Sequence, residues 1–126
     1  MSSPKDRRYL DSHEWHLPQD DGTVTVGLSA FAVDELTDIT YVEVSTDSGN
    51  ISAGDTFGEI ESVKATSDLY CGVDGEVVEV NAAVIEKPEL INEDCFGAGW
   101  LIRVKPSDPA QLESLKDAEA YDALHS

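Results

Sequence analysis

Lys64 is the residue whose surroundings most directly suggest chemistry. It lies in the polar run Glu61-Ser62-Val63-Lys64-Ala65-Thr66-Ser67-Asp68, which separates strand-like stretches at residues 57–61 and 69–70. This pattern predicts a hairpin with Lys64 at its tip. An exposed lysine on a rigid hairpin is accessible to an acylating enzyme and can carry a cofactor on a flexible arm. A lysine taken alone in a turn is, by contrast, most often only solvated.

The residues around Lys64 resemble the lipoate-attachment motif of the glycine cleavage system H proteins. The matching run is Glu61-Ser62-Val63-Lys64-Ala65. A biotin carrier would resemble Met-Lys-Met at this place, and lipoyl domains of the 2-oxo-acid dehydrogenases look like Asp-Lys-Ala, so Val63 and Ala65 favour the H proteins. The resemblance implies that Lys64 carries lipoate through an amide and that the lipoate-attaching enzyme recognises Glu61.

Further blocks that resemble this family extend over nearly the whole chain. They are Ser12-His13-Glu14-Trp15, Gly27-Leu28 with Leu36 and Asp38-Ile39, Gly75-Glu76-Val77 with Asn81, Pro88-Glu89-Leu90-Ile91-Asn92, and Gly99-Trp100-Leu101. The chain departs from the family pattern at Thr37, where glycine is usual, at Ser45-Thr46-Asp47, where a Leu-Pro pair is common, and at Cys71-Gly72-Val73-Asp74. These departures fall in expected turns or strand ends, so we expect them to change loop shape rather than function.

Apolar and polar residues alternate over several short segments, as is typical of strands. We expect strands at residues 13–17, 23–26, 41–44, 75–80 and 100–104, and a turn at residues 19–22 that makes the first two a hairpin. Val24 and Val26 are expected to point inward and the neighbouring threonines outward. Trp100, Ile102 and Val104 are expected to be buried on one face of the last strand.

Short helices are expected between the strands and after them. Ser29 is predicted to cap a helix at residues 30–36, Asp108 to cap one that begins at Pro109 with Gln111 as capping-box partner, and Asp117 to cap one that includes Leu124. This order of elements predicts a mainly β fold. The resemblance specifies a small flattened β-sandwich or barrel of the lipoyl-carrier (barrel-sandwich hybrid) type with short helices, including C-terminal helices.

Length and charge limit the possible organisation and partners. The 126 residues predict a single lipoyl-carrier domain, with a core at about 8–105 and C-terminal helices at about 108–124. The formal net charge of -18 disfavours nucleic acid and anionic membranes and favours partners with a basic surface. Acidic surfaces promote solubility, and adaptation to high salt is an alternative that composition does not decide.

The sequence contains no catalytic constellation, no phosphate-binding glycine loop and no cluster of metal ligands. Cys71 and Cys95 lack a Cys-x-x-Cys spacing and are expected to be reduced thiols. His13 and His16 would lie on opposite faces of a strand, which favours a structural or surface role over metal binding. No stretch is long and apolar enough to cross a bilayer, so we expect a cytoplasmic protein. Because no catalytic constellation is present, we expect a protein that is not an enzyme, and we expect it to be monomeric.

The resemblance implies a carrier subunit of the glycine cleavage system. Lipoylated Lys64 would shuttle the aminomethyl group of glycine from glycine decarboxylase (P protein) to the aminomethyltransferase (T protein), and dihydrolipoamide dehydrogenase (L protein) would reoxidise the dithiol. One alternative is an H-like lipoyl donor in lipoate relay, or a lipoyl module of another multienzyme complex. A second is an enzyme in which Lys64 forms a Schiff base, which requires a desolvated lysine and is disfavoured at a polar hairpin tip.

The loaded arm is expected to fold back against the protein near Ser12, Glu14 and Asp68. An aminomethyl group bound to the dithiol is labile in water, and exclusion of water suppresses such side reactions. Its amine is cationic at neutral pH, so the carboxylates of Glu14 and Asp68 are candidate acceptors for charge-assisted hydrogen bonds. The sequence alone does not place residues 14 and 68 on the same side of the molecule.

Overall fold

The structure is a computed structural model that describes residues 4–44 and 49–125. The family departure at Ser45-Thr46-Asp47 lies outside these described residues. Over the described part of the chain the strands form two antiparallel sheets. The larger sheet has the order β1 (Arg8–Tyr9), β2 (Glu14–Pro18), β3 (Val24–Leu28), β9 (Ile102–Pro106), β8 (Gly75–Val80) and β5 (Asn50–Ile51). The smaller sheet has the order β4 (Ile39–Val44), β6 (Thr56–Ser62) and β7 (Thr66–Tyr70).

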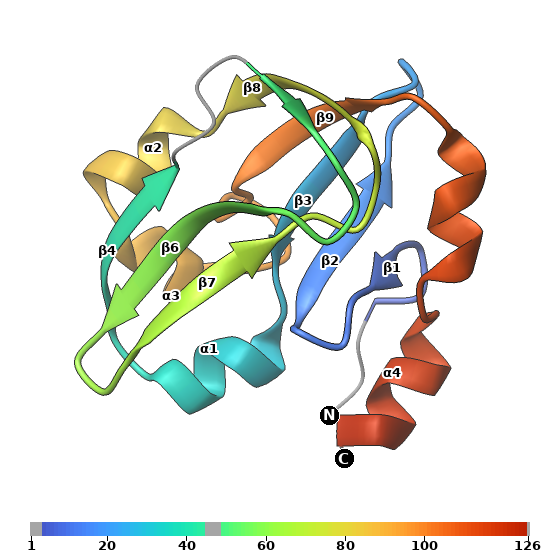
Figure 1. Ribbon diagram of the computed structural model, residues 1–126. Coiled ribbons are helices and arrows are strands. Elements are labelled where there is room, and N and C mark those ends of the chain that lie inside the picture. Colours follow the sequence, from blue (N-terminus) through green and yellow to red (C-terminus); the bar gives the residue numbers. More distant parts are fainter. Residues whose placement is uncertain (1–3, 45–48, 126) are drawn as a thin grey trace.

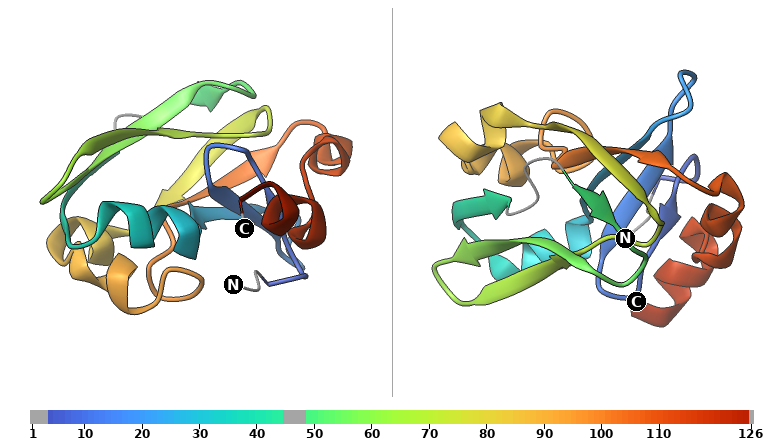
Figure 2. Two further views of the ribbon diagram at one scale, coloured as in Figure 1. Left: turned by 90° about the horizontal axis from the view of Figure 1, so that it is seen from below. Right: turned by 45° about the horizontal axis from the view of Figure 1, so that its top comes forward.

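The helices are short and lie around the two sheets (Figure 1). They are α1 (Ala30–Leu36), α2 (Ala82–Glu86), α3 (Glu89–Glu93), the 3₁₀ helix η1 (Pro109–Ser114) and α4 (Ala118–His125). Figure 2 shows the smaller sheet lying over the larger one, with α4 at the side away from α2 and α3. The predicted mainly β sandwich with short helices, including C-terminal ones, is therefore confirmed.

The main core lies between the two sheets and draws buried side chains from both. The larger sheet contributes Val24, Val26, Leu28, Ile102 and Val104, and the smaller one contributes Val42, Phe57, Ile60 and Leu69. A second group, which we call the aromatic cluster, consists of Tyr9, Trp15, Ala118 and Tyr121. It packs α4 against β1 and β2, so the C-terminal helix is held by its own set of apolar contacts.

Several details of the strand and helix predictions were wrong. Thr25 is buried rather than outward, and its hydroxyl accepts a hydrogen bond from the Gln19 amide at 2.9 Å. Trp100 is only half-buried and precedes β9, where Arg103 lies 4.6 Å over its ring. Gln111 does not close a capping box, because both polar atoms of its amide bond to Asp74 instead.

Ser29 precedes α1 in an extended conformation, but its side chain makes no capping bond to the helix. Its hydroxyl lies 2.5 Å from that of Tyr121 instead. The predicted caps of two other helices are confirmed, since the side chain of Asp108 accepts from the Ala110 amide and that of Asp117 from the Ala120 amide. The first of these helices is 3₁₀ rather than α.

Thr37 ends α1 with a backbone φ of 63° and ψ of -129°. This conformation is strained for a residue with a Cβ atom and is readily adopted by glycine. The conformation of Thr37 therefore accounts for the glycine that the family pattern usually has at this position.

We predict that Thr37→Gly stabilises the fold by about 1 kcal/mol, because relief of backbone strain outweighs the greater freedom of glycine in the unfolded chain. Urea unfolding measures the change. Asp38→Gly is the matched control, since the φ of Asp38 is not positive and the substitution should only destabilise. A Thr37→Gly variant that is less stable than the parent would show that the backbone of Thr37 is not strained.

Candidate functional site

Lys64 lies in the tight turn between β6 and β7 and is exposed. The turn is closed by a backbone hydrogen bond from the Ser62 amide to the Ala65 carbonyl at 2.8 Å. The Ser62 hydroxyl accepts from the amides of both Lys64 and Ala65, each at 3.1 Å. Figure 1 shows this hairpin projecting from the rest of the molecule. The geometry presents the Lys64 amine to solvent on a backbone that Ser62 holds in place.

Acidic side chains cover the outer face of the smaller sheet beside this turn. Glu43, Glu59 and Asp68 are direct neighbours on β4, β6 and β7, and Glu61 is paired with Tyr41 two residues further along. All four carboxylates, which we call the acidic face, are exposed. The Glu43 carboxylate, 3.4 Å from the Tyr41 hydroxyl, raises the pKa of Tyr41. Glu61 is thus an exposed member of the acidic face and lies three residues before Lys64.

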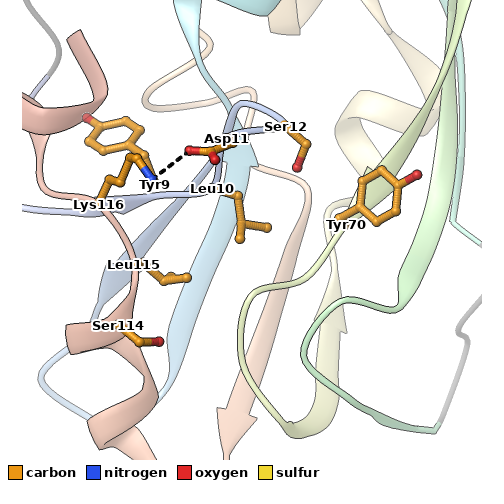
Figure 3. Close-up of a pocket in the computed structure, with 8 residues that line it drawn as sticks. All are labelled: Tyr9, Leu10, Asp11, Ser12, Tyr70, Ser114, Leu115 and Lys116. Atoms are coloured by element: carbon orange, nitrogen blue, oxygen red, sulfur yellow. Dashed lines mark ion pairs between the residues drawn. The ribbon is translucent and has the colours of Figure 1, made fainter. Parts of the chain in front are cut away.

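A groove of about 540 Å³ lies at the other end of β7 (Figure 3). Its lining is formed by Tyr9, Leu10, Asp11, Ser12, Tyr70, Ser114, Leu115 and Lys116. Figure 3 shows Tyr70 on one side and residues at the ends of β1 and η1, with those just after them, on the other. Asp11 and Lys116 form an ion pair there at 3.0 Å. Since β7 begins two residues after Lys64 and ends at Tyr70, one strand connects the exposed lysine to the groove.

Two buried polar side chains of β2 connect the larger sheet to the end of β7. The Glu14 carboxylate accepts from the Tyr70 amide at 2.8 Å through one oxygen and from the Ser12 hydroxyl at 2.5 Å through the other. The His16 Nε2 atom accepts from the Gly72 amide at 2.9 Å. Glu14 and His16 are both fully buried. We call these two side chains the anchor pair, because they bind alternate amides of the segment at residues 70–72.

Burial has opposite effects on the charges of the anchor pair. It raises the pKa of Glu14 to about 7, although the hydrogen bonds from Ser12 and Tyr70 act in the other direction. It lowers the pKa of His16 to about 4, so the imidazole is neutral near pH 7. Because Nε2 accepts a hydrogen bond, the proton of the neutral ring lies on Nδ1, which has no hydrogen-bond partner among the described atoms.

The structure brings some of the predicted arm residues together. Ser12 and Glu14 are in contact, and Glu14 binds the amide of Tyr70, two residues after Asp68. The Asp68 side chain belongs to the acidic face and is not part of the groove lining. Asp68 and Ser12 are exposed, whereas Glu14 is buried behind Ser12 and is not a free surface acid. Lys64 lies apart from Ser12 and Glu14, at the hairpin tip, and Glu61 lies near Asp68 on the acidic face.

Sequence reasoning missed the role of Ser62 and the C-terminal wall of the groove. A serine two residues before the turn lysine is a local signal for a side-chain-stabilised turn, and it was available in the motif. Residues 114–116 gave no such signal. They reach the groove because the backbones of Tyr9 and Lys116 form two hydrogen bonds, a contact between distant parts of the chain.

Glu14→Gln tests the charge state of the anchor pair. Glutamine can accept from the Tyr70 amide and donate to Ser12, but it does not titrate. In the parent, the folded state holds a proton on Glu14 that the unfolded chain loses above its ordinary pKa of 4.5. Stability from this group therefore falls as pH rises from 4.5 to about 7, and we predict that Glu14→Gln gains up to about 3 kcal/mol over that window relative to the parent.

Urea unfolding of both proteins between pH 4.5 and 7.5 measures this difference. His16 contributes the opposite slope between about pH 4 and 6.5 in both proteins, because its unfolded form gains a proton that the folded form excludes, so it cancels in the comparison. Glu93→Gln, at an exposed acid of α3, controls for the change in net charge. A pH-independent difference between parent and Glu14→Gln would contradict the raised pKa.

Comparisons with known proteins agree over almost the full chain. The family model of the glycine cleavage H-protein matches residues 7–126. The glycine cleavage system H protein of Synechococcus sp. (strain RCC307) is 47% identical over 123 residues, covering 98% of this chain and 94% of the relative. That of Vibrio vulnificus (strain YJ016) is 49% identical over 117 residues, covering 93% of each. None of the described helices is long and apolar enough to span a membrane.

A solved structure agrees in fold as well as in sequence. The crystal structure of a glycine cleavage system H protein from Mycobacterium marinum superposes with a TM-score of 0.87 at 38% identity, over 97% of this chain and 98% of that one. The two sheets are thus those of the lipoyl-carrier type expected from the sequence. With a family match over residues 7–126 and near-complete coverage of its relatives, this chain belongs to the glycine cleavage H-protein family.

Proposed function

We propose that this protein is the lipoyl carrier of a glycine cleavage system and that Lys64 is its attachment site. The observation that carries the proposal is the exposed Lys64 in a turn ordered by Ser62, within the run that resembles the family's attachment motif. Amide formation needs an accessible primary amine, which this turn provides. When bound, lipoate supplies a disulfide that accepts the aminomethyl group of glycine.

The residues around the hairpin fit a lipoyl group. Leu10 and Leu115 offer apolar contacts in the groove, and Ser12, whose hydroxyl bonds to the buried Glu14, offers a polar one. Lys64 would hold the group, and β7 leads from Lys64 to this groove. The partners of the carrier would be glycine decarboxylase, the aminomethyltransferase, dihydrolipoamide dehydrogenase and the lipoate-attaching enzyme. The exposed position of Lys64 offers no support for Schiff-base chemistry, which requires a desolvated lysine.

Glu61 would act in recognition by the lipoate-attaching enzyme. It is exposed on β6 close to Lys64, where a change of side chain usually alters stability by less than about 0.5 kcal/mol. The same strand offers a matched control in Glu59, an exposed acid two residues earlier on the same face.

We predict that limiting lipoate ligase modifies the parent at Lys64, does not modify Lys64→Arg, and modifies Glu61→Ala several-fold more slowly. Arginine keeps the positive charge but lacks a nucleophilic amine. Glu59→Ala should be modified at the parent rate, because it removes an equal charge without touching the motif. Tryptic mass spectrometry locates the added mass, and thermal unfolding checks that each variant is folded.

Added mass at another lysine would refute the attachment site. Equal rates for Glu61→Ala and Glu59→Ala would refute specific recognition of Glu61. In that case only the summed charge of the acidic face would matter.

We further propose that the loaded arm lies in the groove near Ser12, Glu14 and Asp68. The support is that Ser12 lines the groove and bonds to Glu14, while Glu14 binds the amide two residues after Asp68. The exposed carboxylate of Asp68 would accept a charge-assisted hydrogen bond from the cationic amine, and the Ser12 hydroxyl, held by the buried Glu14, would offer a polar contact in the groove. The walls of the groove would keep bulk water from the labile group.

Loading the lipoylated protein with glycine and glycine decarboxylase allows loss of the aminomethyl group to be followed as release of ammonia and formaldehyde. We predict that Glu14→Gln combined with Asp68→Asn speeds this loss about tenfold without slowing lipoylation, because the pair removes the charge of Asp68 and alters the partner that holds the Ser12 hydroxyl. Glu59→Gln, directly opposite Asp68, is the control and should leave the rate unchanged. Equal rates in the parent and the double variant would argue against an arm held in the groove.

A further inference from the structure

The C-terminal segment of the chain packs against the turn that carries Ser12. The amide of Tyr9 donates to the Lys116 carbonyl at 2.8 Å, and the amide of Lys116 donates back to the Tyr9 carbonyl at 3.0 Å. Lys116 and the two residues before it also form one side of the groove (Figure 3). The segment that leads into α4 is therefore attached to β1 just before the turn at residues 10–13.

Tyr121 of α4 makes a second attachment to the same turn. Its ring is fully buried and stacks on Tyr9 with the ring centres 4.7 Å apart and the planes at 13°. Its hydroxyl lies 2.5 Å from Nδ1 of His13 and 2.5 Å from Oγ of Ser29. Burial raises the pKa of Tyr121 to about 12, so the phenol keeps its proton near neutral pH. The C-terminal helix thus places a neutral hydroxyl between the Ser12 turn and the start of α1.

His13 is the residue of the turn whose backbone most needs such support. It has a φ of 86°, which is unfavourable for a residue other than glycine and persists where surrounding contacts fix it. Its amide donates to the Leu10 carbonyl at 3.0 Å, and its carbonyl accepts from the Ser29 amide at 2.8 Å. The Tyr121 hydroxyl adds a side-chain contact to these backbone ones.

The conformation of His13 determines where its neighbours in sequence point. Ser12 precedes it and lines the groove, and Glu14 follows it and holds the Tyr70 amide. The Leu10 amide closes the turn by donating to the Glu14 carbonyl at 3.0 Å. A change at His13 would therefore shift the Ser12 hydroxyl relative to the Glu14 carboxylate.

We infer that Tyr121 is a positioning residue for the groove: its hydroxyl fixes His13 and thereby the turn that presents Ser12 to Glu14. This inference rests on the proposed function, because it gives the C-terminal helix a part in shielding the loaded arm. Tyr121 lies in α4, away from the hairpin tip, so attachment of lipoate to Lys64 should not depend on it.

The first test uses the protein without lipoate and therefore does not depend on the proposed function. Tyr121→Phe removes the hydroxyl and keeps the ring that stacks on Tyr9. In ¹⁵N–¹H spectra we expect the amide signals of Ser12, His13 and Glu14 to shift and to exchange with solvent about fivefold faster, as expected for loss of one hydrogen bond. Ala118→Gly is the matched control, because it weakens α4 by about the propensity difference between alanine and glycine and keeps the hydroxyl.

The second test measures loss of the aminomethyl group from the lipoylated, loaded protein. Tyr121→Phe should lose it about fivefold faster than the parent while its lipoylation rate is unchanged. Ser29→Ala removes the Ser29 hydroxyl that lies beside that of Tyr121, keeps the contact of Tyr121 with His13, and should behave like the parent. Ala118→Gly should do the same.

The two tests can fail independently, so a failed positioning role can be told from a failed proposed function. Unshifted Ser12 and Glu14 amides in Tyr121→Phe, or equal effects of Tyr121→Phe and Ala118→Gly in either test, would overturn the positioning role. If the parent cannot be lipoylated or loaded, the proposed function fails and the spectra alone decide the role of Tyr121. Shifted amides with faster loss in Tyr121→Phe alone would establish it.

Discussion

The anchor pair of Glu14 and His16 is the constraint on which the arrangement of the site depends. The smaller sheet shares no strand ladder with the larger one in the described structure, and the amides of Tyr70 and Gly72 lie where the chain leaves β7. Buried amides need acceptors, and β2 supplies them through two side chains instead of its backbone. The cost is two buried titratable groups, one with a raised and one with a lowered pKa.

Gly72 shows how tightly this junction is packed. A Cβ atom there would lie 3.2 Å from Nε2 of His16 and 3.0 Å from the Leu115 side chain. The end of the hairpin, strand β2 and the C-terminal segment therefore meet at one small residue. This contact also accounts for the position of the groove, which lies where these three parts of the chain come together.

The acidic face reduces the stability of the smaller sheet beside Lys64. Glu43, Glu59 and Asp68 are adjacent across three strands, and like charges in directly opposed positions are destabilising. Salt screens such exposed repulsion, and basic groups on a partner would relieve it. The high negative charge of the chain is thus partly concentrated beside Lys64.

The parts of the structure that local patterns determine were predictable from the sequence. The Lys64 hairpin, the hairpin of β2 and β3, and the caps at Asp108 and Asp117 follow from alternation and turn chemistry within a few residues. Burial of Glu14 could not be predicted in this way, because its acceptor role depends on the amide of Tyr70, 56 residues away.

Contacts between distant parts of the chain explain the remaining errors. Strand β3 is buried along its full length, so alternation of valine and threonine did not mark an exposed face. Gln111 bonds to Asp74 at a separation of 37 residues, which overrode the local capping pattern. The wall of the groove at residues 114–116 likewise depends on pairing with Tyr9.

Carriage of the aminomethyl group of glycine for a decarboxylase remains our proposal for this protein. The exchange of labelled bicarbonate into the carboxyl group of glycine, catalysed by glycine decarboxylase in the presence of this protein, tests it. We expect exchange that requires lipoylated protein and is absent with the unmodified chain. A lipoylated protein that supports no exchange with an active decarboxylase would refute the proposed function and favour a lipoyl donor or a module of another complex.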